Sequence, residues 1–161
     1  NLGASFAGKD GFLDRSLEMV AAGLEKDFID QTLETDIDEL GKRHNKMINI
    51  VRTMGSYCPM FGMLGTIIGV ILVLKDVSSI DTIISGMSLA LLTTLYGLFF
   101  SSVIFIPLTN KLKSLSNDEK LSKEIIREGI LLVMDKEIPL KVEKYLTSYV
   151  TSSEKGKFSK G

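Results

Sequence analysis

Two uncharged stretches decide the fold: TMGSYCPMFGMLGTIIGVILVL at residues 53–74 and TIISGMSLALLTTLYGLFFSSVIFIPLTN at residues 82–110. A helix needs roughly 20 apolar residues to cross a hydrocarbon layer about 30 Å thick, and both stretches are longer than that. A chain of 161 residues has too little protein to surround two helices that are apolar on every side. The sequence therefore predicts an all-α membrane protein, a transmembrane helical hairpin with amphipathic cytoplasmic helices before and after it.

Charge is segregated along the chain. The net charge is −1, but between residues 53 and 110 only Lys75, Asp76 and Asp81 are charged, and all three lie in the connection between the spans. Basic residues flank the other ends of the spans: Lys42, Arg43, Lys46 and Arg52 before the first, and Lys111, Lys113, Lys120 and Lys123 after the second. Both ends of the hairpin are therefore expected in the cytoplasm, with the basic flanks against membrane lipids. Without an excess of basic residues, the sequence gives no case for nucleic acid.

The chain divides into five expected regions. They are a remnant of an earlier membrane helix (1–8), a cytoplasmic helical region (9–52), the hairpin (53–110), C-terminal cytoplasmic helices (111–150) and a disordered tail (151–161). Apolar spacing predicts a short helix with Leu13, Leu17, Val20 and Leu24 on one face, ended by Gly23. A second helix, with a stripe of Ile29, Leu33, Ile37, Leu40, His44 and Met47, is expected to enter the membrane without a break.

Two signals predict helix starts after the hairpin. Ser116 and Glu119 have the spacing of a capping box, in which both side chains satisfy free backbone N–H groups, and predict a new helix that runs to about Met134. Pro139 suits the first position of a last helix, because its missing N–H would have no partner there in any case.

Small residues form a face on each span. The first span carries Gly55, Gly62, Gly65, Thr66 and Gly69, and the second carries Gly86, Ala90, Thr94, Gly97 and Ser101. Small side chains let helix backbones approach closely in lipid. Two interpretations stay open: packing within the hairpin, or a surface for further helices.

Oxygen atoms at mid-membrane depth suggest an ion path. Thr66, Thr93 and Thr94 carry hydroxyls there, while Pro59 and Pro107 each remove a helical N–H donor and free a backbone carbonyl. Such oxygens can line a path for a hydrated cation, although each hydroxyl can also bond only to its own backbone. Neither span contains Asp, Glu, His, Lys or Arg. A titrating proton carrier must therefore come from another segment or subunit.

Catalysis finds no support in the motifs. The glycines of GMLGTIIG lack the terminal Gly-Lys-Ser/Thr of a Walker loop, and no nucleophile with an adjacent base is recognisable. His44 and Cys58 are each the only residue of their kind, so no metal-ligand cluster is expected. We expect neither an enzyme nor a bound cofactor.

The same motifs resemble the flagellar motor stator A subunit, the MotA/PomA family, which is related to the ExbB/TolQ energisers. CPMFGMLGTIIGVILVL and SGMSLALLTTLYGLFFSSVIFIPLTNKL are similar to its third and fourth membrane helices. FLDRSLEMVAAGLEKDFIDQTLETDIDE and EIIREGILLVMDKEIPLKVEKYL resemble its cytoplasmic regions, so the resemblance covers about residues 11–150. The TTLYG run followed by a proline and KL is specific to this family, whereas ExbB/TolQ proteins usually lack that ending.

The resemblance implies a subunit of the bacterial inner membrane that couples H⁺ or Na⁺ flow to flagellar rotation, motility and chemotaxis. It implies a ring of five copies around two B subunits, each with one membrane helix and a peptidoglycan-binding domain, and contact with the flagellar rotor. The matching positions Pro59, Gly62, Thr66, Thr93 and Thr94 would lie near an aspartate of the B-subunit helix. Pro107 would couple ion flow to movement.

The family also has two membrane helices and a rotor-contacting segment before this point, and we expect Asn1–Gly8 to be what remains of the second helix. Two alternatives to a stator subunit stay open. One is an ExbB/TolQ-like proton-channel energiser of outer-membrane transport. The other is a membrane-anchored structural adaptor with no ion path.

Overall fold

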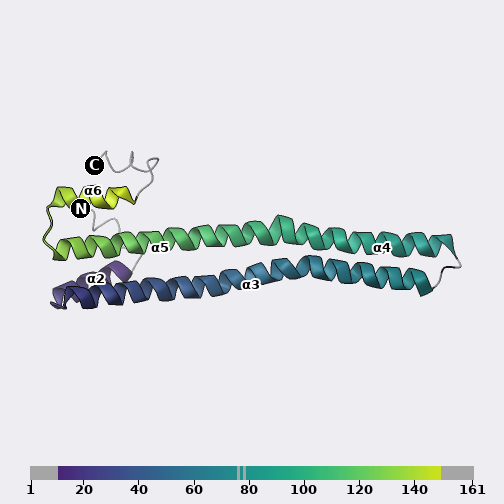
Figure 1. Ribbon diagram of the computed structural model, residues 1–161, viewed down its shortest axis with the longest axis horizontal. Helices are drawn as coiled ribbons and strands as arrows, with labels where there is room; N and C mark the ends of the chain where they lie inside the picture. The colour runs from purple at the N-terminus through teal and green to yellow at the C-terminus, as the bar shows by residue number, and fades with distance from the viewer. Residues whose placement is uncertain (1–10, 76, 78, 150–161) are drawn as a thin grey trace. The chain divides into compact units, whose positions relative to one another are not determined.

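A computed structural model describes residues 11–75, 77 and 79–149 (Figure 1). These residues form the helices α2 (Gly11–Ala21), α3 (Lys26–Lys75), α4 (Ile80–Phe99), the π-helical η1 (Phe100–Phe105), α5 (Ile106–Met134) and α6 (Pro139–Ser148). The predicted helical hairpin is confirmed, and so is the uninterrupted passage of α3 from the acidic region into the first span. The expectations for residues 1–8 and 151–161 lie outside the described residues.

The chain forms two compact units. Among the described residues, the first, which we call the terminal unit, contains 11–42 and 117–149. The second, the hairpin unit, contains residues 43–116. Each has its own packing.

Glycine ends α2 as the sequence predicts. Gly23 has a φ of +73°, a left-handed conformation that costs a glycine little. Its N–H donates to the carbonyl of Val20, and the N–H of Leu24 donates to the carbonyl of Met19. This pair of bonds is a Schellman cap, which satisfies carbonyls that the end of a helix leaves without donors.

The core of the terminal unit is formed by α2, the beginning of α3 and the end of α5. Its buried residues are Phe12, Ile29, Leu33, Ile37 and Ile130. The stripe expected on α3 is thus confirmed as far as Leu40, which is also buried. Beyond it, Met47 is 63% exposed and Ile48 is buried instead.

The buried face of α2 agrees only in part with the expected one, since Leu13 and Val20 pack against the core but Leu24 is 39% exposed. Phe12 and Ser16 are buried, whereas Leu17 is 50% exposed. The larger Phe12 side chain faces the core, and Ser16 follows it one turn later. Ser16 can be buried because its hydroxyl donates to the Phe12 carbonyl at 2.6 Å, so no polar group is left without a partner.

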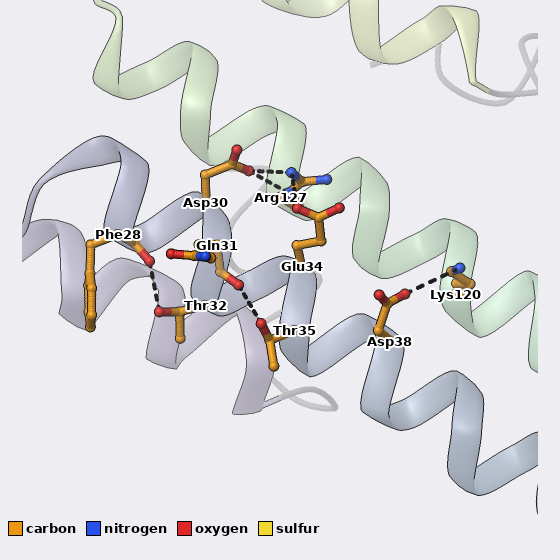
Figure 2. A network of polar contacts seen from close by, with 9 residues as sticks. All are labelled: Phe28, Asp30, Gln31, Thr32, Glu34, Thr35, Asp38, Lys120 and Arg127. Atoms are coloured by element: carbon orange, nitrogen blue, oxygen red, sulfur yellow. Dashed lines mark hydrogen bonds and ion pairs between the residues drawn. The ribbon is translucent and has the colours of Figure 1, made fainter.

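Ion pairs join α3 to α5 in the terminal unit (Figure 2). The Arg127 guanidinium lies between two acidic side chains of α3, 2.5 Å from the Asp30 carboxylate and 3.4 Å from that of Glu34. At the start of α3, Lys26 donates to Asp135 at 2.5 Å, and this hydrogen bond is the main cause that raises the Lys26 pKa. The acidic residues of α3 therefore serve contacts within the chain.

The predicted helix start at Ser116 is wrong. α5 begins at Ile106 and passes through residues 116–119 without interruption. N–H groups need a cap only in the first turn of a helix, and here the preceding turns already provide carbonyl acceptors. The Ser116 hydroxyl lies instead 3.1 Å from Nδ1 of His44 within the hairpin unit. Pro139 does open α6 as predicted.

The outward faces of the hairpin are apolar and uncovered. Phe61, Leu74 and Leu91 are 69%, 70% and 69% exposed, and the described residues contain two helices that are long and apolar enough to cross a membrane. Continuous exposed apolar surface of this kind is rare in contact with water. The hairpin is therefore suited to a lipid surrounding.

Candidate functional site

The two spans approach closely where glycines face each other. A β-carbon on Gly97 would lie 2.6 Å from the Cys58 carbonyl oxygen, and one on Gly62 would lie 3.1 Å from the Thr93 carbonyl oxygen and from Cα of Thr94. These neighbours are backbone atoms, which cannot move aside like a flexible side chain. The close approach of α3 and α4 thus depends on glycine at both positions.

The line of close contacts between the two spans, which we call the seam, continues toward both ends of the hairpin. A β-carbon added to Gly65 would lie 2.5 Å from the Thr93 hydroxyl oxygen, and one added to Gly69 would lie 2.7 Å from Cβ of Ala90. Further contacts pair Gly55 with Phe105 and Gly86 with Val73, and Ser101 is 7% exposed. The small faces noted in the sequence lie against each other within one chain. Their use as a surface for further helices stays a prediction.

Two hydroxyls from α4 converge on one carbonyl of α3. The Thr94 hydroxyl donates to the Gly62 carbonyl oxygen at 3.3 Å. The Thr93 hydroxyl donates to the Ala90 carbonyl at 2.7 Å and also lies 3.4 Å from the Gly62 oxygen. Thr66 bonds within its own helix, to the Met63 carbonyl at 2.6 Å. The structure thus brings Thr93, Thr94 and Gly62 together, and no hydrogen bond among the described residues links Thr66 to them.

The hydroxyl groups of Thr66, Thr93 and Thr94 are arranged to accept hydrogen bonds from a further group, not to donate to it. Each of the three threonines gives its proton to a backbone carbonyl, which leaves the lone pairs of its oxygen for another group. Lone pairs can coordinate a cation or accept a hydrogen bond from a protonated acid. All three residues are half-buried, so their oxygens are not sealed inside the hairpin. The spans contain no Asp, Glu, His, Lys or Arg, the residues that most readily carry a proton within a membrane.

The π-helical turn η1 is a feature that the sequence did not predict. The N–H of Ile106 donates to the carbonyl of Ser101, five residues earlier, which shifts the bonding by one residue. Ser102 thereby loses its α-helical donor, and Val103 has none because Pro107 lacks an N–H. The proline predicted one freed carbonyl, whereas the register shift makes two in succession. Pro59, by contrast, lies inside the unbroken α3.

Residues 5–125 match the MotA/TolQ/ExbB proton channel family. Chemotaxis protein PomA of Vibrio alginolyticus is 29% identical over 144 residues, which are 89% of this chain and 57% of that protein. Motility protein A of Bacillus subtilis is 31% identical over 150 residues, or 93% of this chain and 56% of that protein. The chain thus spans about half the length of these relatives.

A solved structure matches the fold as well. The flagellar MotAB stator complex of Bacillus subtilis contains a chain that superposes with a TM-score of 0.88 at 31% identity, covering 99% of this chain and 63% of that one. The family description names a channel and not an enzyme, in agreement with the expectation from the motifs. The resemblance seen in the sequence is confirmed: the chain belongs to the MotA/TolQ/ExbB proton channel family.

Proposed function

We propose that this chain forms the membrane hairpin of a stator subunit that couples the flow of H⁺ or Na⁺ to flagellar rotation. The observation that carries the proposal is the superposition on the Bacillus subtilis MotAB stator complex over 99% of the chain. The relatives cited above are named for chemotaxis and motility, which favours a motor over the other roles known in the family.

The ion path would run along the outer side of the seam at Thr93 and Thr94. Their oxygens replace part of the hydration shell of a cation, and the half-buried position excludes part of the water. A sodium ion needs several such oxygens. A proton needs a readily ionised carrier such as a carboxylate, and the spans contain no Asp or Glu. In either case an acidic side chain of a partner helix completes the path.

The partner expected from the resemblance has one membrane helix with an aspartate and a peptidoglycan-binding domain. Copies of the chain would form a ring around two such partners in the bacterial inner membrane. Because the glycine faces of the spans are occupied within each hairpin, this proposal places the contacts between copies on other faces of α3 and α4, in preference to the small-residue faces.

The experiment that tests this function is identification of the co-purifying partner. The protein is expressed with an affinity tag from its own locus, extracted in mild detergent and isolated with whatever it binds. A partner with one membrane helix and a peptidoglycan-binding domain is the expected result, together with loss of swimming when the gene is deleted.

Two other results would replace the proposal. A partner with a periplasmic domain that couples to outer-membrane transport, in a strain that still swims after deletion, would identify an energiser. A stable complex that contains neither kind of partner would identify a structural adaptor.

A further inference from the structure

A cleft lies where the two spans end opposite their connection. Its volume is about 260 Å³, and its polar lining includes Arg52 and Ser56 from α3, Ser101 from η1, and Thr109 and Asn110 from α5. Sites that enclose a drug-sized ligand have volumes of roughly 300–1,000 Å³, so this cleft suits a smaller group. Among the residues that the structure describes, no acidic side chain lines it.

Three donors in the cleft have weak partners or none among the described residues. Ser101 is only 7% exposed, and its hydroxyl makes no hydrogen bond within the described chain. The Asn110 amide has no bond there either. Arg52 makes one long bond of 3.3 Å to Asn49 on its own helix and no ion pair within the described residues.

Two other hydroxyls of the cleft, those of Ser56 and Thr109, already have hydrogen-bond acceptors. Ser56 donates to the Thr53 carbonyl and Thr109 donates to the Phe105 carbonyl, both at 2.8 Å. The Ser101 residue is largely buried, but its hydroxyl is not sealed off, so it can donate to a ligand that enters the cleft. The lining of the cleft therefore includes three groups that can donate to an anion: a guanidinium, a side-chain amide and the hydroxyl of a largely buried serine.

We propose that the cleft binds the phosphodiester group of an acidic glycerophospholipid. Guanidinium groups bind phosphate oxygens in pairs, and the other two donors can reach the remaining oxygens. Arg52 directly precedes the first apolar span and Asn110 ends the second, which is the depth of lipid headgroups. Phe105 and the 52% exposed Ile106 supply an apolar wall for the acyl chains. A soluble phosphate would make no use of that wall.

The test measures retention of phosphatidylglycerol by the purified protein in detergent, by native mass spectrometry over a series of lipid concentrations. Arg52→Gln is expected to weaken retention at least about tenfold, and Ser101→Ala several-fold, since each removes one donor to a charged group. Lys113→Gln makes the same change of charge outside the cleft, and Ser102→Ala removes a neighbouring hydroxyl that does not line it. Both controls should retain lipid like the unmodified protein.

Several outcomes would overturn the assignment. Equal weakening by Lys113→Gln would leave only the general attraction of the basic flanks. Displacement of the lipid by inorganic phosphate would identify a soluble anion as the ligand. Unchanged lipid retention with an altered oligomer size in Arg52→Gln would identify a contact with a second copy. Should Arg52→Gln lose helicity by circular dichroism, the Ser101→Ala and Ser102→Ala pair still gives the answer.

Discussion

At the scale of single residues, the Gly62 carbonyl accepts a hydrogen bond that links the two spans. Thr94 reaches it from the other helix, whereas Thr66 bonds only within α3. A hydroxyl that bridges two helices fixes the contact between them, and in the proposed path it would also supply an oxygen to the ion. Thr94 is therefore expected to be more sensitive to substitution than Thr66.

This difference predicts the order of single variants. Thr94→Val keeps the shape of the side chain and removes the oxygen, and swimming speed should fall further than in Thr66→Val. Thr94→Ser, which keeps the hydroxyl, should restore most of the speed. The loss should be larger in sodium-driven than in proton-driven swimming, because a dehydrated sodium ion needs the oxygens themselves. Equal speeds in Thr94→Val and Thr94→Ser would show that the hydroxyl has no part in the path.

Glycine contacts give a second prediction at this scale. Gly97→Ala places a β-carbon 2.6 Å from the Cys58 carbonyl oxygen, and should lower the free energy of unfolding by about 1–3 kcal/mol. Gly41→Ala is the matched control, since a β-carbon there meets nothing within 4 Å in the interior of α3. It should stabilise the protein by about 0.5–1 kcal/mol. Thermal unfolding in detergent measures both, and an unchanged midpoint for Gly97→Ala would contradict the observed seam.

The sequence predicted which residues form the seam better than it predicted what they contact. Small residues at spacings of three and four identified the faces of both spans, because that spacing returns to one side of a helix. Whether these faces meet each other or a neighbour depends on tertiary packing, which spacing does not encode. The acceptor of Thr94 lies 32 residues away and could not be read from the chain alone.

At the scale of secondary structure elements, η1 and Pro107 act together. The π turn leaves the Ser102 and Val103 carbonyls without α-helical donors just where the proline removes an N–H. Weakened backbone bonding at one level of a helix makes a point of bending. We therefore expect the second span to move about this turn during function.

Pro107→Ala tests that expectation. The variant regains an N–H that can bond to the Val103 carbonyl, so it should assemble normally, unfold at an equal or higher temperature, and swim poorly. Complex size by gel filtration and swimming speed are measured on the same strain. Normal swimming would leave Pro107 as a packing residue with no mechanical role.

Element boundaries show where prediction from the sequence stopped. The helix end at Gly23 and the helix start at Pro139 were predicted correctly. A glycine that can adopt a left-handed conformation commonly ends a helix, and a proline without an N–H fits the first position of one. The Ser116 and Glu119 pair was misread, since the same residues fit the middle of a helix equally well. η1 escaped entirely, because no residue in FSSVIF demands a π turn.

At the scale of the whole molecule, the two units should respond separately to substitution. Arg127 joins α3 to α5 in the terminal unit, and its side chain is only 19% exposed. Arg127→Gln should lower the stability of that unit by about 1 kcal/mol. We expect no larger effect, because the acidic partners of Arg127 are more exposed to solvent than Arg127 itself. Lys42→Gln breaks an ion pair with Glu39 in which both side chains are well exposed to solvent, and should leave the stability nearly unchanged.

Hydrogen exchange resolves the two units in this comparison. Faster exchange in α2 and the first turns of α3, with unchanged protection in α4, is the expected result for Arg127→Gln. Equal loss of protection in α4 would show that the terminal unit and the hairpin unfold as one.

The proposed role of the threonine oxygens in carrying the ions that drive a motor can be measured in tethered cells. Their only copy of the gene carries both Thr66→Val and Thr94→Val, and complex assembly is verified by co-purification. We expect an intact complex and little or no rotation. Full rotation by the double variant would contradict this role and leave both hydroxyls as packing residues bonded to the backbone.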